Sequence, residues 1–158
     1  IIIRGNSGSG KSTVAEMVRT RLGGKVAIVA QDNLRRTILG ESDEMGNTDI
    51  IGLLDVTVRY CLQLDYTVIV EGILSKPKYQ ELIGSLSQLD HVQSYTFYID
   101  ISLDETLKRH QTKPIAKEVT EDQVRSWYQP QNYLDVPDEV IIDEKSSLEE
   151  TVELILRS

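Results

Sequence analysis

Residues 5–12 read Gly-Asn-Ser-Gly-Ser-Gly-Lys-Ser, and this stretch decides the fold. It has the spacing G-x-x-x-x-G-K-S, which is the Walker A pattern. The apolar run 1–3 precedes it, and residues 13–18 have the apolar spacing of an amphipathic helix. A strand, a glycine-rich loop and a helix in this order are the setting that a phosphate-binding loop requires. We therefore expect residues 5–12 to join the first strand to the first helix.

The phosphate loop is expected to hold a nucleotide chiefly through its backbone. Its glycines let successive N–H groups turn inward toward phosphate oxygens, and the positive end of the helix dipole faces the same anion. Lys11 is expected to contact the β- and γ-phosphates, and the Ser12 hydroxyl to ligate magnesium. ATP and Mg²⁺ are thus the expected cofactors. The residues expected to bind them are Gly5, Asn6, Ser7, Gly8, Ser9, Gly10, Lys11, Ser12 and Thr13.

The composition is that of one globular domain. The chain has 158 residues, of which 40% are hydrophobic and 27% are charged. Its net charge of −8 disfavours a long nucleic acid or an anionic membrane as the partner. No apolar run approaches the roughly 18 residues that cross a bilayer. The single cysteine, Cys61, excludes an internal disulfide and favours a reducing cytoplasm. We expect a single domain, residues 1–158, with no obligate protein partner.

Apolar strands alternate with helical segments along the chain. The expected strands lie at 1–4, 26–30, 67–70, 95–101 and 140–142. The expected helices lie at 11–22, 33–39, 49–64, 77–89, 102–110, 120–127 and from 147 onward, the last three opened by capping boxes at Ser102, Thr120 and Ser147. Apolar strands separated by helices indicate a parallel sheet covered on both faces. The expected fold is a three-layer α/β/α P-loop NTPase fold with a five-stranded parallel sheet.

Asp32 and Arg35 follow the strand 26–30, at the edge of the sheet where ligands gather in such folds. A carboxylate there can accept the proton of a substrate hydroxyl as it attacks the γ-phosphate. Arg35, one helical turn further on, could clamp a polar or anionic substrate or offset developing charge. The alternative for Asp32 is that its side chain only caps the short helix that follows. Capping and catalysis are compatible.

With its phosphate loop followed by D-x-x-R after the second strand, the chain resembles the small P-loop kinases. These include zeta toxins, chloramphenicol phosphotransferase and the phage polynucleotide kinase domain. The resemblance covers the order of the sheet elements, the motifs of the first ~40 residues and the place of a lid. It implies a phosphotransferase in which Asp32 is the base that activates the acceptor hydroxyl and Arg35 is the substrate-binding arginine.

Glu71 follows the strand 67–70, where P-loop proteins often keep an acidic Walker B residue. Three functional roles are open for it: binding magnesium through a water, orienting a substrate hydroxyl, or accepting a hydrogen bond from the phosphate-loop region. A strand-end acid that merely faces solvent is the structural alternative. We count Glu71 with Asp32 and Arg35 among the expected substrate-binding residues.

Residues 109–127 are expected to form a lid. The polar stretch 111–119 interrupts the alternation of strands and helices, and it lies between Arg109 and Arg125. The resemblance implies that such a lid closes over the phosphates, which excludes water and brings positive charge to the phosphoryl group. Arg109, Lys113 and Arg125 are the expected lid residues. The alternatives are that Arg109 complements the dipole of its own helix and that Lys113 is an ordinary loop charge.

The sequence therefore predicts an ATP-dependent kinase that moves the γ-phosphate of ATP to a hydroxyl of a small molecule. The expected catalytic residues are Lys11, Asp32, Arg35 and Arg109. A nucleotide-dependent switch or a partner-regulated ATPase is the alternative, and it would need a group that holds an attacking water and ordered switch loops. The chain contains no guanine-reading N-K-x-D sequence and has little length to spare for a partner-docking insertion, which favours the kinase.

Overall fold

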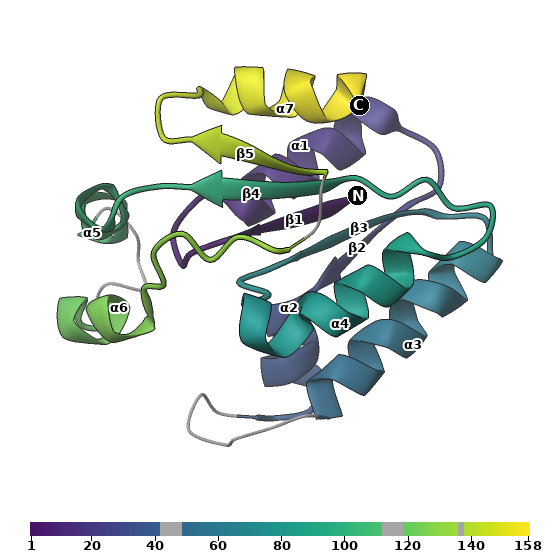
Figure 1. Ribbon diagram of the computed structural model, residues 1–158, viewed down its shortest axis with the longest axis horizontal. Coiled ribbons are helices and arrows are strands. Elements are labelled where there is room, and N and C mark those ends of the chain that lie inside the picture. The colour runs from purple at the N-terminus through teal and green to yellow at the C-terminus, as the bar shows by residue number, and fades with distance from the viewer. Residues whose placement is uncertain (42–48, 112–118, 136–137) are drawn as a thin grey trace.

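The computed structural model describes residues 1–41, 49–111, 119–135 and 138–158, in which strands and helices alternate (Figure 1). The strands are β1 (Ile2–Gly5), β2 (Val26–Ala30), β3 (Thr67–Gly72), β4 (Thr96–Asp100) and β5 (Glu139–Asp143). The helices of these residues are α1 (Lys11–Leu22), α2 (Gln31–Asn33), the π-helix η1 (Leu34–Ile38), α3 (Asp49–Gln63), α4 (Lys76–Ser87), α5 (Leu103–Gln111), α6 (Glu121–Trp127) and α7 (Leu148–Arg157).

The strands form one five-stranded parallel sheet in the order β2-β3-β1-β4-β5. Figure 1 shows α1 and α7 on one face of this sheet and α3 and α4 on the other. The helices α5 and α6 lie beyond the carboxyl ends of β4 and β5, toward which the arrowheads point. The expected three-layer α/β/α fold with a five-stranded parallel sheet is confirmed.

The central strands bury side chains on both faces of the sheet. In β1, Ile2 belongs to the core cluster with α3 and α4, and Ile3 to the cluster with α1 and α7. In β3, Val68 and Val70 lie on the first side and Ile69 on the second. Successive side chains of a strand point to opposite faces, so a strand covered on both sides has to be apolar throughout. This packing explains the unbroken apolar runs of the sequence.

Two of the three expected capping boxes are present in full. At Thr120 and at Ser147 the hydroxyl accepts the N3 backbone N–H, and the N3 side chain accepts the N-cap N–H. The box at Ser102 is only half formed. The Ser102 hydroxyl accepts the Glu105 N–H at 3.2 Å, whereas the Ser102 N–H donates to the Glu144 carboxylate. The Glu105 carboxylate binds Arg109 instead. No helix of the described residues is long and apolar enough to cross a membrane.

The short helix expected at 33–39 begins earlier and is mostly a π-helix. It starts at Gln31, directly after β2, and continues as η1 to Ile38. Gly40 then has a φ of +66°, the left-handed conformation in which helices commonly end. Single-turn π-helices are uncommon and gather at functional sites. This one carries Arg35, next to Asp32 at the carboxyl edge of the sheet.

Candidate active site

The phosphate loop, residues 5–12, carries the chain from β1 into α1 at the carboxyl edge of the sheet. Gly8 and Gly10 have φ values of +78° and +101°, which L-residues with a side chain rarely adopt. A Cβ atom on Gly5 would lie 2.5 Å from the carbonyl oxygen of Ile99 in β4. Glycine at these positions is what lets the loop curl and pass its neighbouring strand. The expected order of strand, loop and helix is confirmed.

Lys11 is the first residue of α1, and it is buried with its ammonium turned back onto the loop. Nζ donates to the Asn6 carbonyl oxygen at 2.8 Å and to Ser9 Oγ at 3.4 Å. The positive charge is thereby held against the backbone of the phosphate loop. An anion that enters the loop meets this charge together with the amino-terminal end of α1.

Asn6 differs from the other loop residues because its side chain is fully engaged elsewhere. Its Nδ2 donates to the Gln129 carbonyl oxygen at 2.9 Å and to the Tyr98 hydroxyl at 3.3 Å, and its Oδ1 accepts the Gln129 N–H at 2.9 Å. The residue is only 2% exposed. Asn6 is among the residues expected to bind nucleotide, and these bonds leave its backbone rather than its side chain for that contact.

Ser12 and Glu71 face each other across the sheet edge. The Ser12 hydroxyl donates to Glu71 Oε1 at 3.2 Å. This contact corresponds to the third role that the sequence left open for Glu71, and the buried carboxylate is not a solvent-facing strand end. Burial raises the pKa of Glu71 above its ordinary 4.5, and the Asp32 carboxylate adds to the rise. The Lys11 ammonium and the Ser12 hydrogen bond act in the opposite direction.

The Ser12–Glu71 pair suits a magnesium ion in its chemistry. Mg²⁺ prefers oxygen ligands, takes few carboxylates and keeps several waters. A hydroxyl and one carboxylate beside a phosphate loop supply that set of donors. Ser12 could bind the ion directly and Glu71 through one of the waters.

Asp32 and Arg35 form an ion pair at the carboxyl edge of β2. Arg35 NH2 donates to Asp32 Oδ1 at 3.3 Å, and Arg36 Nε lies 3.9 Å from the same oxygen. The Asp32 side chain is 55% exposed and therefore accessible to a substrate, whereas that of Arg35 is 13% exposed. The capping alternative for Asp32 is wrong, because the N-cap of α2 is Ala30 and no side chain bonds its free N–H groups.

Three further side chains lie near this ion pair, and no motif or periodicity pointed to them. Tyr79 of α4 is buried, and burial raises the pKa of its hydroxyl, which interacts with Arg35, Gln31, Asp32 and Glu41. Gln31 packs on β3, where a Cβ on Gly72 would lie 2.7 Å from Gln31 Cβ. Glu41 is buried, and its Oε2 accepts no hydrogen bond from the described residues. Together these groups form a polar cluster next to the phosphate loop.

A cavity of about 440 Å³ lies on the opposite side of the phosphate loop. The loop contributes Ser9 and Gly10, and Arg109 approaches from α5. Arg109 Nε donates to Glu105 at 2.7 Å, and its NH1 donates to the Ser9 carbonyl oxygen at 3.3 Å. The remaining lining residues are Thr13, Val14, Ile99, Ile101, Asp143, Glu144, Lys145, Ser146, Ser147, Leu148 and Thr151. The size and the mixed polar and apolar walls suit a nucleotide base and its ribose.

The expected lid residues have different surroundings. Arg109 touches the backbone of the phosphate loop, through the Ser9 carbonyl oxygen. Arg125 is exposed on α6. Lys113 lies outside the described residues. His110, next to Arg109, is buried, and its Nε2 lies 2.7 Å from the carbonyl oxygen of Val119.

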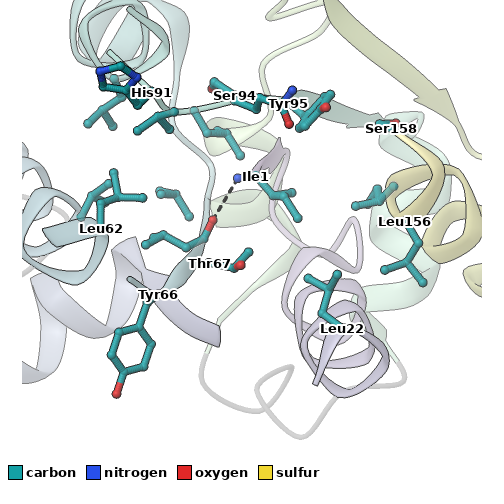
Figure 2. Close-up of a pocket in the computed structure, with 18 residues that line it drawn as sticks. Ile1, Leu22, Leu62, Tyr66, Thr67, His91, Ser94, Tyr95, Leu156 and Ser158 are labelled. Atoms are coloured by element: carbon teal, nitrogen blue, oxygen red, sulfur yellow. Dashed lines mark hydrogen bonds between the residues drawn. The ribbon is translucent and has the colours of Figure 1, made fainter. Parts of the chain in front are cut away.

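A second cavity, of about 470 Å³, lies at the amino ends of the strands (Figure 2). Its walls are largely aliphatic and aromatic, with Leu22, Leu62, Tyr66 and Leu156 among them. The dashed line in Figure 2 marks the bond from the Ile1 amino group to the Val68 carbonyl oxygen, at 2.9 Å. None of the residues expected to bind nucleotide or substrate lines this cavity.

A family model described as an AAA domain matches residues 1–149. The chain belongs to this family. The match extends from the start of β1 into the start of α7 and so takes in every strand of the sheet. No curated protein matches the chain in sequence.

Solved structures share the fold of this AAA domain along nearly its whole length. The APS kinase of Mycobacterium tuberculosis, in complex with AMPPNP and APS, is 17% identical, with a TM-score of 0.76 over 99% of this chain and 95% of that one. A sugar kinase from Janibacter sp. HTCC2649 is 17% identical, with a TM-score of 0.75 over 99% and 91%. A gluconokinase from Sinorhizobium meliloti 1021 is 17% identical, with a TM-score of 0.62 over 99% and 88%. The resemblance to small P-loop kinases is confirmed at the level of the fold.

Proposed function

We propose that this AAA domain is an ATP-dependent phosphotransferase that moves the γ-phosphate of ATP to a hydroxyl group of a small molecule. The observation that carries the proposal is the position of Glu71, which lies between residues of the phosphate loop and Asp32. On one side it bonds Ser12 and interacts with Lys11, and on the other it interacts with Asp32. The phosphate loop and the Asp32–Arg35 pair therefore lie close together at the carboxyl edge of the sheet, where a donor and an acceptor can meet.

The nucleotide side consists of the phosphate loop and the cavity beside it. The loop N–H groups and Lys11 bind the triphosphate, and the cavity that contains Lys145 and Thr13 receives the base and ribose. Bound magnesium would neutralise phosphate charge, with Ser12 and Glu71 holding it. Arg109 already contacts the Ser9 carbonyl oxygen. A rotation of its side chain would bring the guanidinium to the phosphates, where it can offset charge on the transferring group.

The acceptor side consists of Asp32 and Arg35. Asp32 accepts the proton of the acceptor hydroxyl as its oxygen bonds to the γ-phosphorus and the bond to the β-phosphate oxygen breaks. Arg35, which already pairs with Asp32, orients the acceptor. Glu71 can orient the same hydroxyl. The APS kinase and the sugar kinases that share the fold support a hydroxyl acceptor of metabolite size.

The parts of residues 109–127 that the structure describes fit the role of a lid. The helices α5 and α6 stand beyond the carboxyl edge of the sheet, over the side where the phosphate loop lies (Figure 1). We place the lid in this segment, within a single domain that spans residues 1–158. We also infer that the protein works in the cytoplasm, because a single cysteine favours a reducing compartment.

The proposal is tested by ATP consumption with and without a panel of hydroxyl compounds. The panel should contain sugars, sugar acids, nucleosides and hydroxyl-bearing antibiotics, with mass spectrometry to detect the gain of a phosphate group. Turnover that depends on one acceptor class supports the kinase. Hydrolysis that no acceptor changes and that a protein partner stimulates would instead support a nucleotide-dependent switch.

A further inference from the structure

Arg4 is a fully buried arginine in the strand that leads into the phosphate loop. The proposed reaction gives it no role, since it is inaccessible to solvent and none of its hydrogen-bond partners is proposed to bind nucleotide or acceptor. A buried guanidinium is costly unless its N–H groups are bonded and its charge is matched. The partners that Arg4 uses therefore show what it holds together.

Every nitrogen of the Arg4 guanidinium donates a hydrogen bond. Nε donates to the Leu74 carbonyl oxygen at 3.1 Å, and NH1 donates to Glu139 Oε1 at 2.7 Å. NH2 donates to both oxygens of Asn132, to the carbonyl at 2.7 Å and to Oδ1 at 2.8 Å. The guanidinium also lies 4.9 Å from the centre of the Tyr98 ring. We call Arg4, Leu74, Asn132 and Glu139 the Arg4 network.

The Arg4 network joins the segment that follows the lid to the turn between β3 and α4. Asn132 Oδ1 accepts the Lys76 N–H at 2.7 Å in addition to its bond from Arg4. Leu74, in the same turn, is buried with a φ of +41°, a conformation that costs energy for a residue with a side chain. The bond from Arg4 to the Leu74 carbonyl helps to hold that conformation. The second oxygen of Glu139 accepts the Leu134 N–H at 2.7 Å.

The post-lid segment in turn reaches the phosphate loop. Gln129 bonds the Asn6 side chain through both its N–H and its carbonyl oxygen, and its own Oε1 accepts from Asn132 Nδ2 at 2.8 Å. The Asn6 carbonyl oxygen then holds Lys11 Nζ. A continuous series of hydrogen bonds therefore runs from Arg4 through Asn132, Gln129 and Asn6 to the lysine that meets the phosphates.

We infer that the Arg4 network is a positioning device for the phosphate loop: by fixing Gln129 through Asn132, it sets the place of Asn6 and hence of Lys11 beneath the γ-phosphate. The inference rests on the proposed function in one respect, the assignment of Lys11 to the phosphates. A network that only stabilised the fold would leave the preference of the loop for a triphosphate over a diphosphate unchanged. A positioning network changes that preference, because Lys11 contacts the terminal phosphate that a diphosphate lacks.

The test uses two substitutions at Asn132, which touches neither nucleotide nor acceptor. Asn132→Ala removes Oδ1, which accepts bonds from Arg4 and Lys76, and Nδ2, which donates to Gln129, while the backbone carbonyl bond to Arg4 remains. Asn132→Asp is the matched conservative variant, since a carboxylate oxygen accepts both bonds and the Gln129 side-chain amide can rotate to donate to it. Calorimetric titration with magnesium AMPPNP and with magnesium ADP gives the ratio of the two affinities, at a temperature where denaturation curves show each variant folded.

The Ala variant is expected to lower the AMPPNP-to-ADP affinity ratio by about tenfold, the scale of a weakened hydrogen bond to a charged group. Amide hydrogen exchange at Gln129 and Lys76 should rise by about tenfold as well. The Asp variant should restore both values to within about twofold of the wild type. A folded Ala variant with the wild-type ratio, or with wild-type exchange at Gln129, would overturn the inference.

The exchange measurement separates this inference from the proposed function. If the wild-type protein bound neither nucleotide, the proposed function would fail, and amide exchange would still decide whether Asn132 fixes Gln129. Faster exchange at Gln129 in the Ala variant, reversed in the Asp variant, would then support the network. Unchanged exchange would refute it.

Discussion

The two ends of the sheet carry cavities of nearly the same volume, about 440 Å³ beside the phosphate loop and about 470 Å³ at the amino ends of the strands. The walls of the first include the loop, Arg109 and the polar residues 143–147. The walls of the second are mainly aliphatic and aromatic side chains of the core layers (Figure 2). Volume alone therefore does not distinguish the two ends of the sheet.

The difference follows from how a parallel sheet is built. At the carboxyl edge, β1, β2 and β3 each end in a loop or short helix that carries polar side chains. The amino ends receive the returning helices, whose apolar faces pack against the sheet. Ligands of open α/β sheets bind at the carboxyl ends for this reason. Substitutions at the two ends should therefore have different effects on binding, transfer and stability, and the predictions below test that difference.

The largest effect is expected at Asp32. Asp32→Asn keeps the size of the side chain and removes its basicity, so phosphoryl transfer should fall by about 10²- to 10⁴-fold. Nucleotide binding should be unchanged, because Asp32 lies on the acceptor side. The check is the rate of phosphorylated product together with a calorimetric titration of the same protein. Normal transfer by the Asn variant would show that Asp32 is not the base.

The second prediction compares an arginine at each end of the molecule. Arg4→Met leaves the Glu139 carboxylate buried without its partner, which should lower the free energy of unfolding by about 3–5 kcal/mol. Arg21, at the end of α1, pairs with Glu149 and Glu153 on the surface. Its replacement by Met is the matched control and should have little effect, since exposed ion pairs are screened by solvent. Urea denaturation measures both, and equal losses would contradict the contrast.

The pKa of Glu71 gives the stability of the carboxyl edge a specific dependence on pH. Because burial raises the pKa of this carboxyl in the folded state, the folded protein binds the proton more tightly than the unfolded chain does. The resulting stabilisation is complete below the ordinary pKa of 4.5 and is lost as the pH rises through the raised value.

Glu71→Gln removes this titration and is the matched control. Without nucleotide or magnesium, the wild type should lose stability relative to the Gln variant as the pH rises from about 4 to about 8. Denaturation curves across that range give the difference in the free energy of unfolding at each pH. A difference that is constant, or that changes with the opposite sign, would show that Glu71 is not buried as described.

The smallest effect is expected at the amino-end cavity. His91 lines it with a φ of +64°, a conformation that asparagine tolerates well. His91→Asn should therefore leave nucleotide affinity and transfer within about twofold of the wild type, as for sites that share no partners. Kinetics and titration under the conditions used for Asp32→Asn make the two ends directly comparable. A large loss at His91 would assign function to this cavity.

Much of this architecture could be predicted from local sequence. The phosphate-loop motif predicted the positions of β1 and α1, and the apolar runs predicted those of the remaining strands. Asp32 and Arg35 were found because the residues after a parallel strand meet at one edge of the sheet. The capping boxes at Thr120 and Ser147 were found because their bonds join residues three apart.

The rest depends on contacts between distant parts of the chain. Arg4 stands at the end of an apolar run and gave no sign of its burial, since its partner Asn132 is 128 residues away. Tyr79 interacts with Arg35 and Gln31 only because the fold brings α4 to them from a distant part of the chain. The Ser102 box was half wrong because Glu144, from the turn after β5, competes for the same N–H. Periodicity and motifs carry no information about such pairs.

The most direct test of the account is a calorimetric titration of the folded protein with magnesium AMPPNP, repeated with Lys11→Met. Both the phosphate-loop assignment and the proposed reaction require that the loop bind a triphosphate. We expect saturable binding at one site in the wild type and a large loss of affinity in the Met variant. Equal heats for the two proteins, or no binding by the folded wild type, would contradict it.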